Sequence, residues 1–400
     1  MKKTITILSY FFFGFFCLVL IIILRPIIRI RIGKLNTSRI GHLATNTALY
    51  YTKNILLKEN NYLDLFYCDK IISNKYLLKL WSKKINILPR ILLFSVFNLI
   101  IKFNYTQKYH YADNNYGGDQ DPQQVLQKFE KILEIPSTDE VEGKIILEKL
   151  GTDNRKIILF FARDEAHTNY LLKKNTDIRF HSYRNANIDN FLLAAEELAS
   201  RGYALIRMGS IVKKKINSNS KFVIDYSNSS YRSDFMDIYL QSKCEFFITS
   251  GTGINEVARL FKKPLLYVSF APYAYSPTYI SKIICIYKKV FDRKNNKLLS
   301  LSEMFNSGVA QAYHRDVFEE KDIDLIENTP EEIKVAAFEM IEAIENNFKI
   351  FKEDIDIQKK FWDIYYENIQ KFATYRLGDR DSYKMQIGKK FLKDNLYLLD

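Results

Sequence analysis

The sequence predicts an α/β protein with a parallel sheet and two domains. One feature predicts the class and another predicts the number of domains. From residue 156 onward, short apolar strands alternate with helices, which is typical of β-α-β units. The chain has 400 residues, a length that indicates two domains. Hydrophobic residues make up 47% and charged residues 26%, which excludes a mostly disordered chain.

The second half of the chain gives the most regular pattern. We expect strands at 157–162, 203–208, 222–226, 245–249 and 265–270, and helices at 189–201, 233–243 and 254–261. Gly202 ends the first of these helices. Because parallel sheets bind ligands at the carboxyl ends of their strands, the loops there should carry the function. Residues 151–330 are thus predicted as one domain and the charged, helical residues 331–400 as a tail.

Residues 26–150 are predicted as the other domain, with a less regular pattern. We expect strands at 27–32 and 63–68, helices at 42–57, 75–83 and 123–133, and a loop at 104–122 that is rich in Tyr, Asn, Asp and Gly. The apolar run 91–101 is too short to cross a membrane. It is either a buried helix or a helix that faces a membrane beside Lys79, Lys83, Lys84 and Arg90.

Residues 1–25 are predicted as a transmembrane or membrane-embedded anchor helix. Residues 5–24 carry no charge, and a helix of about 20 residues crosses the hydrocarbon core. A cleaved signal peptide is the alternative, but the run is long and no small-x-small cleavage site follows. More basic residues follow the run than precede it. The positive-inside rule therefore places the body of the protein on the cytoplasmic side of the inner membrane.

The sequence is basic, but it predicts neither a nucleic-acid partner nor a bound metal. Lys and Arg number 59 and Asp and Glu 46, a net charge of +13. We expect no nucleic-acid partner, because the sequence has no zinc finger, dense basic stripe or aromatic RNA-binding signature. The four cysteines form no CxxC pair and no ligand cluster is evident, so we expect no metal.

A Ser/Thr/Gly loop is the strongest local motif. Ser250, Gly251, Thr252 and Gly253 connect a strand directly to a helix. A helix N-terminus presents free N–H groups that suit phosphate, and glycine lets the backbone approach a ligand closely. The loop is neither a P-loop nor GxGxxG. Glu256, in the first turn, binds sugar hydroxyls or complements the helix dipole. An ordinary β-α loop is an equal alternative.

Arginines follow several of the predicted strands. Arg163, Asp164, Arg207 and Gly209 lie at strand ends, and Arg184 and Asn185 lie in a polar and aromatic loop before a helix. Arginine offers a planar fork of donors that matches phosphate oxygens. Several cations and a helix N-terminus at one sheet edge would suit a diphosphate, so we predict a nucleotide or nucleotide-sugar ligand. A surface Arg163–Asp164 pair and a solvent-facing Arg207 are the alternatives.

His42 is the candidate for proton transfer. It follows a glycine turn in the N-terminal domain, and histidine titrates near neutral pH. A structural role for His42 is the alternative.

Taken in order, these motifs resemble a bacterial family of GT-B-like glycosyltransferases associated with surface-polysaccharide gene clusters. The matching segments are RIGHL at 39–43, FARD at 161–164, YRN at 183–185, IRMG at 206–209, DYS at 225–227, RSDFMD at 232–237 and SG at 250–251. The segment 161–164 also looks like the Arg-containing strand end of GT-B fucosyltransferases. Those enzymes usually have His where this chain has Phe161 or Ala162.

The resemblance implies two facing Rossmann-like domains, an N-terminal one for the acceptor and a C-terminal one for the nucleotide-sugar donor. It implies no bound metal and no cofactor besides the donor. Arg163 and Arg207 would neutralise the departing diphosphate, and the amides of 250–253 would add a dipole. Glu256 would orient the donor and His42 would act as base. Asp164 joins the catalytic candidates, and Arg184, Asn185 and Gly209 join the donor-binding ones.

The predicted function is transfer of a sugar to a cell-envelope acceptor, either a polysaccharide or a lipid-linked glycan. A sugar-nucleotide epimerase is one alternative, since some epimerases also use two Rossmann-like domains. A non-catalytic glycan-binding or scaffold protein of a polysaccharide assembly complex is another. The predicted anchor favours the transferase, because soluble sugar nucleotides do not require a membrane.

Overall fold

The computed structural model describes residues 2–57, 62–112, 121, 123–166, 178–372 and 384–400, and the side chains of 2–9 and 178–180 are excepted. The chain divides into two compact units. Unit 1 comprises Met1–Asp121 and Val125–Glu134, and unit 2 comprises Pro122–Gln124 and Ile135–Asp400. Each unit contains a parallel β-sheet with helices, so the predicted α/β class is confirmed.

Unit 1 is built on a three-stranded parallel sheet. The strands β1 (Arg29–Leu35), β2 (Tyr62–Cys68) and β3 (Asn86–Ile87) lie in the order β1-β2-β3. The helices of this unit are α2 (Ile40–Leu57), α3 (Lys75–Ser82), α4 (Arg90–Ile100) and α5 (Asn104–His110). In α2 the side chains from Leu43 to Tyr50 are buried, and the Tyr50 ring packs edge-on against Phe66 of β2, with ring centroids 4.7 Å apart.

Two local predictions in unit 1 are wrong. The segment predicted as a loop at 104–122 begins with helix α5, and its residues 113–120 and 122 lie outside the described residues. The helix predicted at 123–133 is a single 3-10 turn, Val125–Lys128. The carboxylate of Asp121 accepts hydrogen bonds from the amides of Val125 and Leu126, both at 2.8 Å. This side chain therefore caps a short turn, and the apolar residues that follow are buried without a helix.

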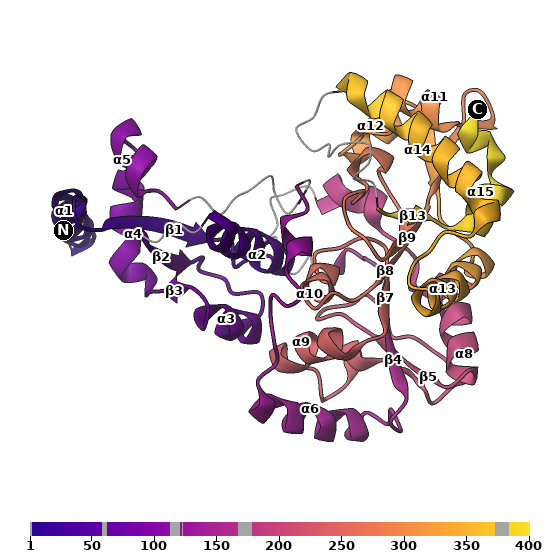
Figure 1. Cartoon of the computed structure of the whole chain (residues 1–400), viewed down its shortest axis with the longest axis horizontal. Coiled ribbons are helices and arrows are strands. Elements are labelled where there is room, and N and C mark those ends of the chain that lie inside the picture. The colour runs from indigo at the N-terminus through magenta and orange to yellow at the C-terminus, as the bar shows by residue number, and fades with distance from the viewer. Residues whose placement is uncertain (1, 58–61, 113–120, 122, 167–177, 373–383) are drawn as a thin grey trace. The chain divides into compact units, whose positions relative to one another are not determined.

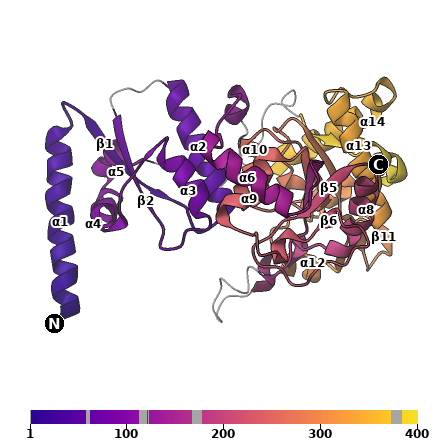
Figure 2. The same ribbon diagram turned by 90° about the horizontal axis from the view of Figure 1, so that it is seen from below.

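The N-terminal helix α1 (Lys2–Leu24) packs beside α4 (Figure 2). Gly14 lies so close to Ser95 that an added Cβ would be 2.9 Å from the Ser95 Cβ. Leu18 and Ile21 are buried in the same cluster as Leu93 and Val96 of α4. In the part of the chain that the structure describes, no helix is long and apolar enough to cross a membrane. The membrane anchor predicted for residues 1–25 stays a prediction.

Unit 2 is built on a seven-stranded parallel sheet (Figure 1). Its strands are β4 (Lys156–Phe161), β5 (Tyr203–Arg207), β6 (Val223–Ile224), β7 (Phe246–Thr249), β8 (Leu265–Phe270), β9 (Ile283–Tyr287) and β13 (Gln386–Ile387). They lie in the order β13-β9-β8-β7-β4-β5-β6. Numbered from β4, the first six strands have the order 3-2-1-4-5-6 of doubly wound nucleotide-binding sheets. The predicted strands of this sheet are confirmed, and β9 and β13 are additions.

Helices cover both faces of this sheet. Figure 1 shows α8 (Leu192–Ser200) and α13 (Pro330–Glu345) on one face and α9 (Asp234–Lys243) and α10 (Asn255–Leu260) on the other. The strands β7, β8 and β9 are buried along their whole length. Their near-continuous apolar sequence follows from burial on both faces. A small sheet of β10 (Lys289–Asp292), β11 (Lys297–Leu298) and β12 (Ile323–Ile326) and the helices α11 (Leu301–Asn306) and α12 (Arg315–Glu320) follow.

Two segments join unit 2 that the sequence placed elsewhere. Helix α6 (Ser137–Lys149) was not expected; its Gly143 lies against the Tyr239 ring, and Glu140 pairs with Lys243 at 2.6 Å. The units consequently divide near residue 135, not at residue 150. The expected tail forms α13, α14 (Ile355–Ile369), β13 and α15 (Lys389–Asp394). The described residues of this tail, 331–372 and 384–400, contribute to the unit 2 core, and β13 extends the main sheet beside β9.

Candidate functional site

The topological switch point of unit 2 lies between β4 and β7, the first and fourth strands of the doubly wound order. Phe161 and Thr249 are partners in the ladder, so the loops after both strands leave the sheet side by side. The amide of Arg163 donates to the Oγ of Ser250 at 2.9 Å, and the Ser250 amide donates to the Phe161 carbonyl at 3.3 Å. The structure thus joins the two loops that the sequence singled out.

Arg163 is half-buried at this point, and its side chain is fixed. Its Nη1 donates to the His181 carbonyl at 3.0 Å and to the Oδ1 of Asn185. The Asn185 Nδ2 donates to Glu165 at 3.0 Å, which fixes the orientation of the amide. Burial, followed by repulsion from Arg184, lowers the pKa of Arg163 to about 10, so it stays a cation at neutral pH. Within the described residues, Nε and Nη2 of Arg163 have no protein acceptor.

Arg184 provides a second cation at the same place. Its Nη2 donates to the carbonyl of Gly251 at 2.5 Å. Gly251 has a φ of +80°, and an added Cβ would lie 2.7 Å from the Phe270 ring. Only glycine fits both conditions without a shift of its neighbours. Two arginines from different segments, Arg163 after β4 and Arg184 at the end of 178–184, therefore contact the loop that follows β7.

The predicted phosphate loop is partly satisfied by the protein itself. The amide of Gly251 donates to the Thr249 hydroxyl at 3.2 Å, and the Thr252 amide donates to Asn255 at 2.7 Å. Glu256 accepts from Arg259 and from Asn255, both at 3.0 Å. These contacts give the loop its shape and engage groups that were predicted to bind donor. The predicted contacts of Gly253 and Glu256 with a ligand stay predictions.

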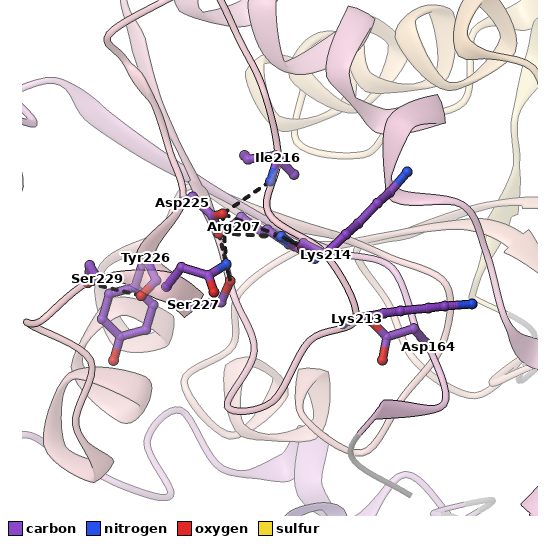
Figure 3. Close-up of polar contacts among 10 residues, drawn as sticks. Asp164, Arg207, Lys213, Lys214, Ile216, Asp225, Tyr226, Ser227 and Ser229 are labelled. Atoms are coloured by element: carbon purple, nitrogen blue, oxygen red, sulfur yellow. Dashed lines mark hydrogen bonds and ion pairs between the residues drawn. The ribbon is translucent and has the colours of Figure 1, made fainter. Parts of the chain in front are cut away.

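Arg207 and Asp164 make their contacts with other residues of unit 2 (Figure 3). Arg207 is only 1% exposed; its Nη1 donates to the Lys214 carbonyl at 2.6 Å and pairs with Asp225 at 3.4 Å. Asp225 also accepts from the Ile216 amide at 3.1 Å. Asp164 accepts from the amides of Ala166 and Lys213, at 2.9 and 2.8 Å.

Both acidic side chains thus tie the loops after β4, β5 and β6 together. Burial lowers the pKa of Arg207, and the pair with Asp225 opposes that effect. Gly209, at φ +137°, lies against Val212 and Phe161 and allows this close packing. The geometry gives Arg207, Asp164 and Gly209 contacts within the protein, and their predicted contacts with the donor stay predictions.

Unit 1 contains a cleft of about 600 Å³ at the carboxyl ends of β1 and β2. Arg39 and His42, which the sequence singled out, lie on its wall near the start of α2. The Nζ of Lys34 pairs with Asp69 at 2.7 Å across the two strand ends. The lining residues are Lys34, Asn36, Ser38, Arg39, His42, Asp69, Lys70, Ile71 and Arg90.

No protein-family model matches this sequence, and no match is found among curated proteins. Among solved structures, the chain is similar to ADP-heptose lipopolysaccharide heptosyltransferase II of E. coli, with 12% identity and a TM-score of 0.44 over 80% of this chain and 99% of that one. It is also similar to a glycosyl transferase family 9 protein from Veillonella parvula DSM 2008, with 11% identity and a TM-score of 0.43 over 78% of this chain and 97% of that one. The UDP-GlcNAc 2-epimerase of Neisseria meningitidis has 14% identity and a TM-score of 0.31 over 79% of this chain and 99% of that one. TM-scores below 0.5 at these identities establish neither a shared fold nor a shared function.

Lys288 and Glu327 support the site and were missed by the sequence reading. Lys288 follows β9 and is 4% exposed; its Nζ donates to the Asn185 carbonyl at 2.5 Å. Glu327 lies 3.9 Å from that Nζ and accepts from the Asn187 amide at 2.8 Å. Both side chains fix the segment that carries Arg184. The available signal was the apolar run 283–287 followed by lysine, which marks another strand end.

We expect a pH-dependent stability difference between the wild type and the variant Lys288→Met. Burial lowers the pKa of Lys288 from 10.5 to about 8, and Glu327 opposes this while Arg163 adds to it. Between pH 8 and 10 the unfolded chain holds more protons than the folded one, so rising pH stabilises the wild type. From pH 8 to pH 10, the free energy of unfolding of the wild type minus that of the variant should rise by about 2 kcal/mol.

Urea unfolding at several pH values measures this difference, and the buried tyrosines cancel because both proteins contain them. A difference that stays constant from pH 8 to 10 would contradict the lowered pKa.

Proposed function

We propose that the protein is a glycosyltransferase that transfers a sugar from a nucleotide-sugar donor to a cell-envelope acceptor, a polysaccharide or a lipid-linked glycan. The observation that carries the proposal is the placement of Arg163 and Arg184 at the switch point of a doubly wound sheet. Ligands bind at this position in such sheets, and guanidinium forks match the oxygens of a diphosphate. The presence of a parallel α/β sheet in each unit is compatible with a GT-B-like arrangement.

In this proposal unit 2 binds the donor. The bond between the sugar C1 and the diphosphate oxygen breaks, and negative charge builds up on the departing nucleoside diphosphate. Arg163 and Arg184 neutralise this charge, and stabilisation of a developing charge by fixed cations is a large catalytic term. The contacts of Arg163 with His181 and Asn185 orient the guanidinium before the donor arrives.

Unit 1 binds the acceptor in the same proposal. The acceptor hydroxyl oxygen forms the new bond to C1, and its proton passes to His42 in the cleft of unit 1. We assign positioning roles to Asp164 and Arg207, because their side chains join the strand-end loops. The donor is the only small molecule that this scheme requires.

We further propose that the protein works at the cytoplasmic face of the inner membrane. This proposal is supported by large apolar side chains that α1 exposes, among them Phe12, Phe16 and Ile23. Helix α4 exposes Ile91 and Leu92 next to Arg90. Apolar side chains beside cations are typical of segments that lie in a lipid interface.

Release of nucleoside diphosphate tests the proposed reaction. We expect purified full-length protein, incubated singly with UDP-, GDP- and ADP-linked sugars, to release nucleoside diphosphate slowly from one of them by hydrolysis. The variant Arg184→Gln should lose most of this activity. Arg293→Gln, which replaces an exposed arginine directly after β10, should keep it. Conversion of the donor into an isomeric sugar nucleotide would favour an epimerase, and binding without turnover would favour a scaffold.

A further inference from the structure

The cleft of unit 1 has an excess of positive charge. Lys34, Arg39, Lys70 and Arg90 line it, and Asp69 is the carboxylate among its lining residues. Four basic side chains against one carboxylate leave a surplus of three positive charges. In the described part of the chain, Arg39, Lys70 and Arg90 have no ion-pair partner, and Asp69 is engaged by Lys34. These cations therefore contribute little to folding through ion pairs.

The walls of the cleft are fixed before any ligand binds. The Thr37 hydroxyl donates to the Ile71 carbonyl at 2.7 Å, and the Ser73 amide donates to the Thr37 carbonyl at 2.8 Å. These two bonds join the loop after β1 to the loop after β2. Thr37 itself is fully buried, so both loops are anchored in the unit. A preformed site loses little conformational freedom on binding.

The Arg90 side chain is also oriented. Its guanidinium lies over the Phe94 ring at 4.1 Å and over the Tyr67 ring at 5.3 Å. Its Nη1 lies 3.4 Å from the Cys68 carbonyl, at the end of β2. A guanidinium is planar, and stacking fixes the orientation of its plane, so its remaining donors form a fixed fork that matches phosphate oxygens.

We propose that this cleft binds a phosphoryl group carried by the acceptor, a phosphate or a diphosphate. A phosphate monoester carries about 1.5 to 2 negative charges, which matches the surplus better than one carboxylate does. This inference rests on the proposed function, since it names the acceptor class of the same enzyme. His42 lines the same cleft, so the phosphoryl group would anchor the molecule whose hydroxyl His42 deprotonates.

A titration with inorganic pyrophosphate tests the inference. Full-length protein is used in the Arg184→Gln background, which weakens binding at the switch point of unit 2. We expect binding by calorimetry, a loss of about tenfold or more for Arg39→Gln, and near-retention for Arg39→Lys. Lys83→Gln removes an exposed cation of unit 1 outside the cleft and should leave binding unchanged. Absence of pyrophosphate binding, or equal loss in Lys83→Gln, overturns the proposal.

Three further ligands identify the source of the phosphoryl group. Tighter binding of farnesyl diphosphate than of pyrophosphate supports a lipid-linked diphosphate, and tighter binding of glucose 1-phosphate supports a phosphorylated glycan. Glucuronate bound as tightly as pyrophosphate would overturn the preference for phosphoryl groups. The wild type's release of nucleotide from its donor is measured separately. Failure of that reaction refutes the transferase, whereas failure of the titration alone refutes only the acceptor class.

Discussion

The variant Arg163→Ala should release nucleoside diphosphate about 100-fold more slowly than the wild type, because removal of a charged contact to a leaving group typically costs about 3 kcal/mol. Arg163 is fixed by the His181 carbonyl and by Asn185, and its Nε and Nη2 have no protein acceptor in the described residues. Its loss therefore removes donors that are already oriented. Arg163→Lys keeps the positive charge but lacks the planar fork of donors. Its rate of nucleotide release should therefore lie between those of the wild type and Arg163→Ala.

Steady-state kinetics with the identified donor measures this effect. Arg163 also connects three segments of unit 2, so a fall in rate could reflect a disturbed loop. Guanidinium ion added at millimolar concentration distinguishes these causes, because it restores a missing cation but not a collapsed loop. Unchanged turnover in Arg163→Ala would remove this residue from the mechanism, and a fall without rescue would assign it to structure.

The alternation of strands and helices in unit 2 was predictable because its strands are buried on both faces. Such strands have continuous apolar sequences, as in β7 and β8, and these are recognisable in a single sequence. In a parallel sheet the carboxyl ends of neighbouring strands lie side by side. The contact between Arg163 and Ser250 was therefore predictable as well. Unit 1 was harder to predict, because its segments α5 and 125–128 are too short to show an apolar periodicity. The turn at 125–128 is instead set by the carboxylate of Asp121.

The partners of the site residues were not predictable in the same way. Arg207 turns to Asp225, a residue at the end of another strand, and the sequence did not distinguish this from a ligand contact. Lys288 reaches the carbonyl of Asn185 across 103 residues of sequence. Long-range contacts of this kind depend on strand order, which is available only from the fold. The residue types of the site were thus readable, but not the contacts that engage them.

Substitution of Gly251 by alanine should destabilise unit 2 far more than the same change at Gly308. Both glycines have left-handed backbones, with φ values of +80° and +77°. An L side chain there costs about 1–2 kcal/mol at either position. An added Cβ meets nothing within 4 Å at Gly308, whereas at Gly251 it would lie 2.7 Å from the Phe270 ring. Gly308→Ala is therefore a matched control for backbone strain alone.

The Phe270 ring has little room to move away from a new methyl group. It makes edge contacts with Tyr267 at 5.2 Å and Tyr287 at 5.9 Å, and all three rings are buried. Overpacking of a dense core adds about 1–3 kcal/mol, so the total loss at Gly251 should be about 2–5 kcal/mol. The Gly251 carbonyl also accepts from Arg184, so the shifted loop should slow nucleotide release as well.

Urea unfolding of the two variants measures the difference in stability, and donor turnover measures the effect on the site. Gly308→Ala should keep its turnover and lose about 1–2 kcal/mol. Equal losses in both variants would mean that the Phe270 ring gives way, and the close packing would then not explain glycine at 251. A stability loss at Gly251 without a change in turnover would separate the loop from the chemistry. Arg184 would in that case not depend on the Gly251 carbonyl for its position.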